Sequence, residues 1–122
     1  MIAFASRTGN VRAIVQKLAL PHIEITTNLI MREPFLLFTY TDGLGNVPEV
    51  VAQFMAQNAA YCKGVIASGN SNFGPTRYCG AADTLAEQYK LPIVRKLELR
   101  GFQHDYDAIT AYYHQFKSEV LT

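Results

Sequence analysis

Apolar residues along this chain occur in two patterns, short continuous runs and stripes at helical spacing. Continuous runs at residues 1–5, 35–40 and 64–68 predict strands that are covered on both faces. Two other segments, 22–25 and 93–99, alternate apolar and polar residues and predict further strands, the second of them at a sheet edge. The pattern is therefore that of a sheet with five strands.

Helical stripes lie between and after these strands. The first stripe repeats at i, i+3, i+4 and i+7 and consists of Val11, Ile14, Val15 and Leu18. The second follows Pro48, which suits the first turn of a helix, and carries Val50, Val51, Phe54 and Met55. A third helix is predicted over 81–90, and a last one carries Ile109, Tyr112, Tyr113, Phe116 and Val120.

Strands that alternate with about as many helices predict an α/β fold, in which a parallel sheet has helices on both faces. Right-handed crossovers and one reversal of winding predict a doubly wound sheet with strand order 2-1-3-4-5. No repeat or linker interrupts the pattern, so we expect residues 1–122 to form a single domain. Such sheets bind ligands beyond the carboxyl ends of strands 1 and 3. Three polar, glycine-rich loops leave the carboxyl ends of the strands, at 6–10, 41–48 and 69–80.

Composition excludes several classes of function. The chain has a formal net charge of +1 and no cluster of Lys and Arg, which argues against a nucleic-acid partner. It contains no apolar run of roughly eighteen residues and no signal peptide, so we expect no membrane segment and a cytoplasmic location. Cys62 and Cys79 match neither a redox motif nor a zinc motif, which favours two reduced thiols over a disulfide.

The first loop has the composition of an anion site. It offers the hydroxyls of Ser6 and Thr8, the amide of Asn10, and Gly9, where a backbone can approach a ligand closely. The side chain of Arg7 either adds charge or points into solvent. Neither a Walker loop nor a GxGxxG fingerprint is present. Read alone, this loop favours an ordinary helix start with Ser6 or Thr8 as the cap.

The other two loops add aromatic rings and accessible backbone to the predicted site. Tyr40 and Phe73 are placed at its rim, where each ring either covers a ligand or simply packs. The glycines that would leave backbone accessible are Gly43, Gly45, Gly69 and Gly74. A flat, hydrogen-bonding heterocycle attached to a phosphate would use all three loops together.

Other chemistries are not supported by the sequence. A phosphoryl-accepting receiver domain needs paired acids after the first strand, where this chain has Ala5 and Ser6, and Asp42 alone is insufficient. No ligand-spaced partners accompany the three histidines, so no metal site is predicted; they are His22, His104 and His114. No Ser-His-Asp arrangement or carboxylate pair lies near the loops. Any redox or group-transfer chemistry would therefore come from a bound cofactor.

Several segments resemble one family. "SRTGNV" is similar to the phosphate loop of flavodoxin-like proteins, and "FTYTDGLGNVP" and "GVIASGNSNFG" narrow the match. Together with "AADTLAEQYKLPIVRKLEL" they resemble the NrdI family, the flavodoxin-like partners of class Ib ribonucleotide reductase. The resemblance extends from residue 1 to about residue 103, and the "ASGNSNFG" loop is its most specific part.

The resemblance implies a flavodoxin-like fold and an FMN site. The phosphate would be surrounded by Ser6, Arg7, Thr8, Gly9, Asn10 and Val11, and Val11 replaces a threonine that many flavodoxins have. The isoalloxazine ring would be framed by Tyr40, Thr41, Asp42, Gly43, Leu44 and Gly45, and by Ser68, Gly69, Asn70, Phe73 and Gly74. Gly43 and Gly45 are candidates for a backbone flip linked to the redox state.

Tyr78 and Cys79 are two further candidate neighbours of the ring. Cys79 begins the third helix, where a helix N-terminus lowers a thiol pKa, so we expect either a reactive thiol or one that simply packs.

By the same resemblance, reduced FMN reacts with O2 and supplies superoxide for assembling the dimanganese–tyrosyl radical cofactor of the reductase small subunit. A separate electron donor would reduce the flavin. The flavin loops carry few acids, so we expect its two one-electron potentials to lie closer together than in an acidic flavodoxin. The alternatives are a general one-electron flavodoxin and an interaction module with this fold that has lost its cofactor.

Overall fold

The computed structural model describes residues 1–43, 45–75 and 77–121. Its strands are β1 (Ile2–Phe4), β2 (His22–Glu24), β3 (Phe35–Tyr40), β4 (Cys62–Gly69) and β5 (Ile93–Glu98). Its α-helices are α1 (Asn10–Leu18), α2 (Glu49–Asn58), α3 (Gly80–Tyr89) and α4 (Gln103–Leu121), and short 3-10 turns cover Ala59–Tyr61 and Ser71–Phe73. The predicted strands are all present.

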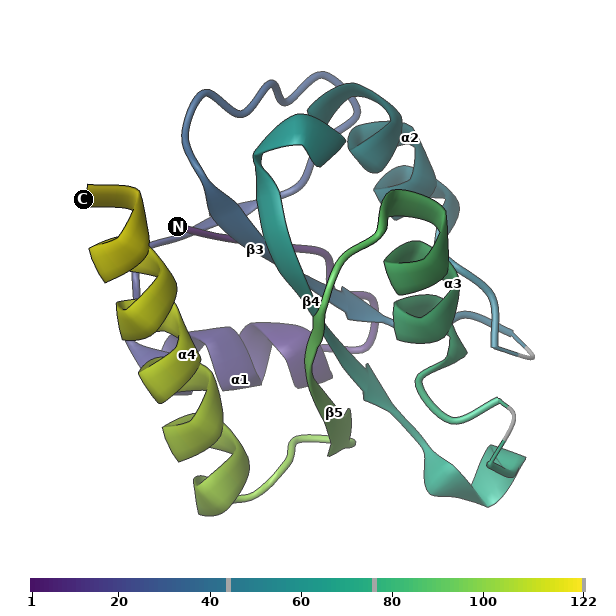
Figure 1. Cartoon of the computed structure of the whole chain (residues 1–122). Helices are drawn as coiled ribbons and strands as arrows, with labels where there is room; N and C mark the ends of the chain where they lie inside the picture. The colour runs from purple at the N-terminus through teal and green to yellow at the C-terminus, as the bar shows by residue number, and fades with distance from the viewer. Residues whose placement is uncertain (44, 76, 122) are drawn as a thin grey trace.

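The strands form one sheet in the order β2-β1-β3-β4-β5, and every neighbouring pair is parallel. This order confirms the doubly wound arrangement predicted from the sequence. Figure 1 shows α1 and α4 on one side of the sheet and α2 and α3 on the other. The described segment 25–34, which connects β2 to β3, contains no helix, so the sheet has one helix fewer than strands.

Alternation within β3 explains why its first four residues are all apolar. In β3, Phe35 and Leu37 face the core beneath α2 and α3, whereas Leu36 and Phe38 face the core beneath α1 and α4. All four side chains are fully buried. Because side chains alternate between faces, a strand covered by helices on both sides needs apolar residues at every position.

A single buried amide anchors the irregular connection between β2 and β3. The Asn58 side chain is at the end of α2, and its Oδ1 accepts the Met31 N–H at 2.7 Å. Its Nδ2 donates to Leu29 O at 3.0 Å and to Phe54 O at 2.9 Å. Backbone groups in this connection therefore find partners without a helix or a strand ladder.

The structure bears on two expectations from the composition, one about membrane-spanning helices and one about the two cysteines. No helix among residues 1–43, 45–75 and 77–121 is long and apolar enough to cross a membrane. Cys62 and Cys79 are both buried as free thiols.

Replacing Asn58 by alanine should destabilise the fold by about 3 kcal/mol, because the Met31 N–H and the Leu29 carbonyl lose their buried partner. Urea unfolding followed by circular dichroism measures this loss. The control is Gln57→Ala, an exposed position one residue earlier in α2, which should change stability little. Equal unfolding midpoints for the two variants would contradict the anchoring role of Asn58.

Candidate functional site

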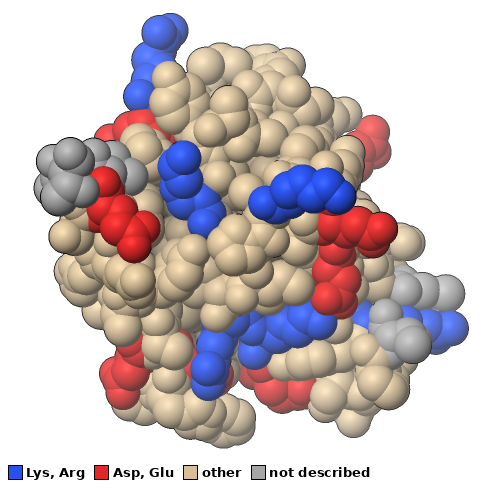
Figure 2. All heavy atoms as spheres, viewed as in Figure 1, with Lys and Arg blue, Asp and Glu red and all other residues tan. Residues whose placement is uncertain are grey.

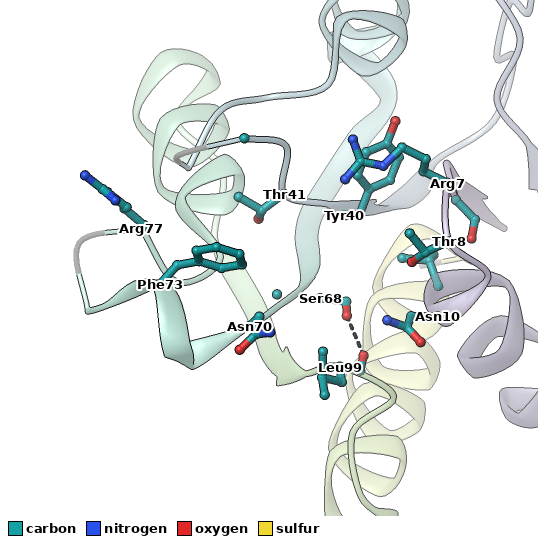
Figure 3. A pocket seen from close by; sticks show the side chains of 14 residues that line it. Arg7, Thr8, Asn10, Tyr40, Thr41, Ser68, Asn70, Phe73, Arg77 and Leu99 are labelled. Carbon is teal, nitrogen blue, oxygen red and sulfur yellow. Dashed lines mark hydrogen bonds between the residues drawn. The ribbon is translucent and has the colours of Figure 1, made fainter.

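Three loops meet beyond the carboxyl ends of β1, β3 and β4 and enclose a pocket of about 140 Å³. Figure 3 shows Phe73 and Asn10 on opposite sides of this pocket, with Tyr40 and Thr41 along another side. Its lining comprises Ser6, Arg7, Thr8, Asn10, Val11, Tyr40, Thr41, Gly43, Ser68, Gly69, Asn70, Phe73, Arg77 and Leu99. The pocket lies at the switch point between β1 and β3, where the strand order predicts a ligand site.

Not every residue singled out from the sequence lines the pocket. Those in the three loops that are absent from its lining are Gly9, Asp42, Gly45, Gly74, Tyr78 and Cys79. Leu44 lies outside the described residues. Asp42 and Gly45 instead contact lining residues from outside the pocket, Asp42 through Arg7 and Gly45 through the backbone of Arg77.

Sequence reasoning missed two lining residues, Arg77 and Leu99. Arg77 belongs to the third loop, and its side chain extends away from the other lining side chains in Figure 3. Leu99 directly follows β5, and its carbonyl accepts a hydrogen bond from the Ser68 hydroxyl. The signal was available, because β5 also ends at the carboxyl edge of the parallel sheet.

The first loop turns into α1 through Gly9, which has φ +95° and occupies the N-cap position. Ser6 Oγ accepts the N–H of Arg12 in the first turn at 3.2 Å, so Ser6 partly fulfils the capping role that the sequence allowed. The first turn of α1 contains no acidic residue. Its N-terminus therefore faces the pocket with the positive end of the helix dipole, which favours an anion.

Arg7 is held in place rather than free in solvent. Its guanidinium lies 5.3 Å from the centroid of the Tyr40 ring and pairs with Asp42 Oδ1 at 2.5 Å. Figure 3 shows the Arg7 side chain lying against this ring. Both members of the ion pair are about half exposed, so its contribution to stability is small. The ion pair instead holds the first and second loops in position relative to each other.

The second loop is a tight reversal closed by Asp42 and Asn46. The Asp42 N–H donates to Asn46 O at 2.8 Å, and the Asn46 N–H donates to Asp42 O at 2.7 Å. Gly43 has φ +47°, a left-handed conformation that side chains disfavour, and its N–H donates to Asp42 Oδ1 at 3.1 Å. Asp42 therefore sets the shape of this loop from outside the pocket.

Close backbone contacts join the second and third loops. A Cβ on Gly80 would lie 2.7 Å from the Gly45 carbonyl oxygen, and one on Gly45 would lie 3.3 Å from Arg77 Cα. A Cβ on Gly69 would lie 2.9 Å from the Cys79 nitrogen. Gly45 and Gly69 were expected to leave backbone accessible to a ligand. Gly69 does line the pocket, whereas Gly45 does not, and both also lie where another segment packs closely against the backbone.

Of the two alternatives for Cys79, a reactive thiol and one that packs, the structure supports the second. Cys79 precedes α3, but its side chain is fully buried, and burial raises the pKa of its thiol to about 11. Its Sγ donates to the Ala67 and Leu97 carbonyls. Burial and the adjacent Cys79 also raise the pKa of Tyr78 to about 12. Both groups stay protonated at neutral pH, and desolvation outweighs the helix dipole at Cys79.

One polar atom in the pocket wall lacks a partner. Thr41 Oγ1 is buried and makes no hydrogen bond with the part of the chain that the structure describes. An unmade buried hydrogen bond costs about 1–3 kcal/mol, and a ligand with a polar edge would satisfy it. Phe73 is 54% exposed at the opposite rim, where a planar ring would cover its apolar face. These features fit a flat heterocycle with hydrogen-bonding edges.

Neither a cluster of metal-ligating side chains among the described residues nor a patch of one charge on the face shown in Figure 2 is found. No group of three His, Cys, Asp or Glu side chains in residues 1–43, 45–75 and 77–121 is arranged to hold a metal ion. On the face shown in Figure 2, Lys and Arg are interspersed with Asp and Glu, in keeping with the net charge of +1.

Comparison with known proteins gives the same result as the motifs. A family model described as "NrdI Flavodoxin like" matches residues 2–111. The chain is 38% identical over 110 residues to Protein NrdI from Bacillus licheniformis, and the match covers 89% of this chain and 83% of that protein.

Solved structures agree with the fold. Oxidised flavodoxin 1 from Bacillus cereus is similar with a TM-score of 0.69 at 20% identity, covering 96% of this chain and 95% of that one. A short-chain flavodoxin associated with a PDU bacterial microcompartment has a TM-score of 0.69 at 16% identity, covering 91% and 90%. At these identities the likeness shows the flavodoxin-like fold alone, which the sequence had predicted.

Replacing Gly80 by alanine tests the contact between the second and third loops. Helix propensity alone would favour alanine, but the added Cβ meets the Gly45 carbonyl at 2.7 Å and should destabilise the fold by about 1–3 kcal/mol. Thr84→Ala, at an exposed position of the same helix, is the control and should cost nothing. Urea unfolding compares the two, and a Gly80→Ala protein as stable as the control would contradict the close contact.

Proposed function

The chain belongs to the NrdI flavodoxin-like family, and from this premise we propose that it is an FMN redox protein that activates a class Ib ribonucleotide reductase in the cytoplasm. The observation that carries the proposal is the pocket. It combines a helix N-terminus, two aromatic side chains and a buried hydroxyl that finds no hydrogen-bond partner among the described residues, at the switch point of the sheet. Its partner would be the dimanganese small subunit of that reductase.

Family membership implies FMN as the cofactor, and the pocket offers residues for each part of it. Ser6, Thr8 and Asn10 lie at the N-terminus of α1, where they and the backbone would hold the phosphate. Thr41 would bond the edge of the isoalloxazine ring, and Phe73 would cover one of its faces.

The chemistry that FMN would supply is one-electron reduction of O2 to superoxide, the oxidant for assembling the dimanganese–tyrosyl radical cofactor. The protein's own side chains set the environment for this electron transfer. Arg7 offsets the charge of Asp42, so the second loop presents little net negative charge to the ring. Weak negative potential around the ring favours its reduced, anionic form. An external reductant would supply the electrons.

Purified protein reduced anaerobically, then mixed with air, Mn(II) and the reductase small subunit, tests the proposal. The expected result is a flavin absorption spectrum followed by a tyrosyl-radical signal in the small subunit. The control omits this protein and should give no radical. A flavin spectrum without radical would instead favour a general one-electron flavodoxin, and absence of flavin even after reconstitution would favour a module that has lost its cofactor.

A backbone flip at Gly43 should couple to the redox state of the flavin. Gly43 lines the pocket at φ +47°, so an added Cβ would restrict the conformations of the adjacent peptide. Gly43→Ala should therefore shift the flavin potentials in a spectroscopic redox titration. Gly74→Ala is the matched control, since Gly74 also has positive φ but does not line the pocket. Equal flavin potentials in the two variants would contradict a redox-linked flip at Gly43.

A further inference from the structure

Three arginines surround the N-terminus of α1, and two of them have acidic partners. Arg7 pairs with Asp42 at 2.5 Å, and Arg12 pairs with Glu24 at 2.7 Å. Arg100 follows β5, and no carboxylate of the described residues pairs with it. The Nε of Arg100 instead donates to the neutral Asn10 side chain, at 3.2 Å from its Oδ1.

The backbone that carries Arg100 is held in place on both sides. The Leu99 N–H donates to Gly69 O at 2.8 Å, and the Ser68 hydroxyl donates to Leu99 O. The Gly101 N–H donates to Glu98 O at 2.7 Å, and the Tyr106 hydroxyl donates to the carbonyl of Arg100 itself. Arg100 therefore projects from a rigid turn, and its position beside the first loop does not depend on its flexible side chain alone.

This placement is electrostatically unfavourable in the protein alone. The N-terminus of a helix carries a partial positive charge, which cations avoid and anions prefer. The first turn of α1 has no acid to offset this charge, and Asn10, the contact of Arg100, is the first residue of the helix. An anion bound next to Asn10, which lines the pocket, would attract both the Arg100 guanidinium and the N-terminus of α1. The position of Arg100 would then be favourable.

We propose that Arg100 binds the phosphate of FMN across the first loop, as a charged contact that supplements the backbone and hydroxyl donors. This inference rests on the proposed function. A phosphate monoester carries a charge of about −1.5 to −2 at pH 7, so the positive end of α1 alone does not neutralise it. Val11 offers no hydroxyl where many flavodoxins have a threonine, and Arg100 supplies a donor to the same region.

Titration of the FMN-free protein with FMN and with riboflavin, which lacks the phosphate, tests this role through quenching of flavin fluorescence. Arg100→Gln should weaken FMN binding about tenfold, as expected for loss of a charge-assisted hydrogen bond. Riboflavin binding should be unchanged. Added salt should weaken FMN binding less in this variant than in the wild type.

The matched control is Arg32→Gln, which removes the same charge from an exposed position in the connection between β2 and β3. It should leave binding of both flavins unchanged. If Arg100→Gln does not fold, Arg100→Ala also removes the guanidinium and is titrated with FMN and riboflavin in its place. Unchanged FMN affinity, or an equal loss for FMN and riboflavin, would overturn the phosphate contact. Failure of the wild type to bind either flavin would contradict the proposed function itself.

Discussion

All five strands run parallel, and this constraint brings the loops that follow them to a single edge of the sheet. Residues far apart in the sequence, in the loops after β1, β3 and β4 and at Leu99, can line one pocket only because of it. The reversal of winding at β1 opens the space between the loops after β1 and β3, where no crossover helix covers the edge. Apolar residues at successive positions of β1, β3 and β4 stabilise the arrangement from both faces. The position of the site is thus a consequence of how the core is built.

Within that frame, the site depends on contacts that leave no room for side chains. The backbones at Gly45 and Gly80 approach so closely that the second loop rests on the start of α3. The salt bridge between Arg7 and Asp42 then joins the second loop to the first, and the hydrogen bond between Ser68 and Leu99 joins β4 to the turn after β5. Thr41 remains with a buried hydroxyl that no described group satisfies. A polar ligand edge would complete this network.

The fold and most of the pocket lining could be predicted from the sequence, because strand and helix patterns and the polar loops are local signals. Roles that depend on packing in three dimensions could not. The sequence does not show that Gly45 and Gly69 each lie where another segment leaves little room for a side chain. The pKa of Cys79 depends on its burial, which the sequence does not show, and burial outweighs its position before a helix. Arg100 meets Asn10 only through the topology, across ninety positions of the chain.

Amide chemical-shift mapping tests the central claim most directly, that one pocket at the carboxyl edge of the sheet binds FMN. Isotope-labelled protein would be titrated with FMN, and the amide resonances of the backbone would be followed. We expect the shifts to concentrate in residues 6–11, 40–43, 68–74, 77 and 99–100 and to saturate at one FMN per chain. Shifts elsewhere on the molecule, or none at all, would contradict it.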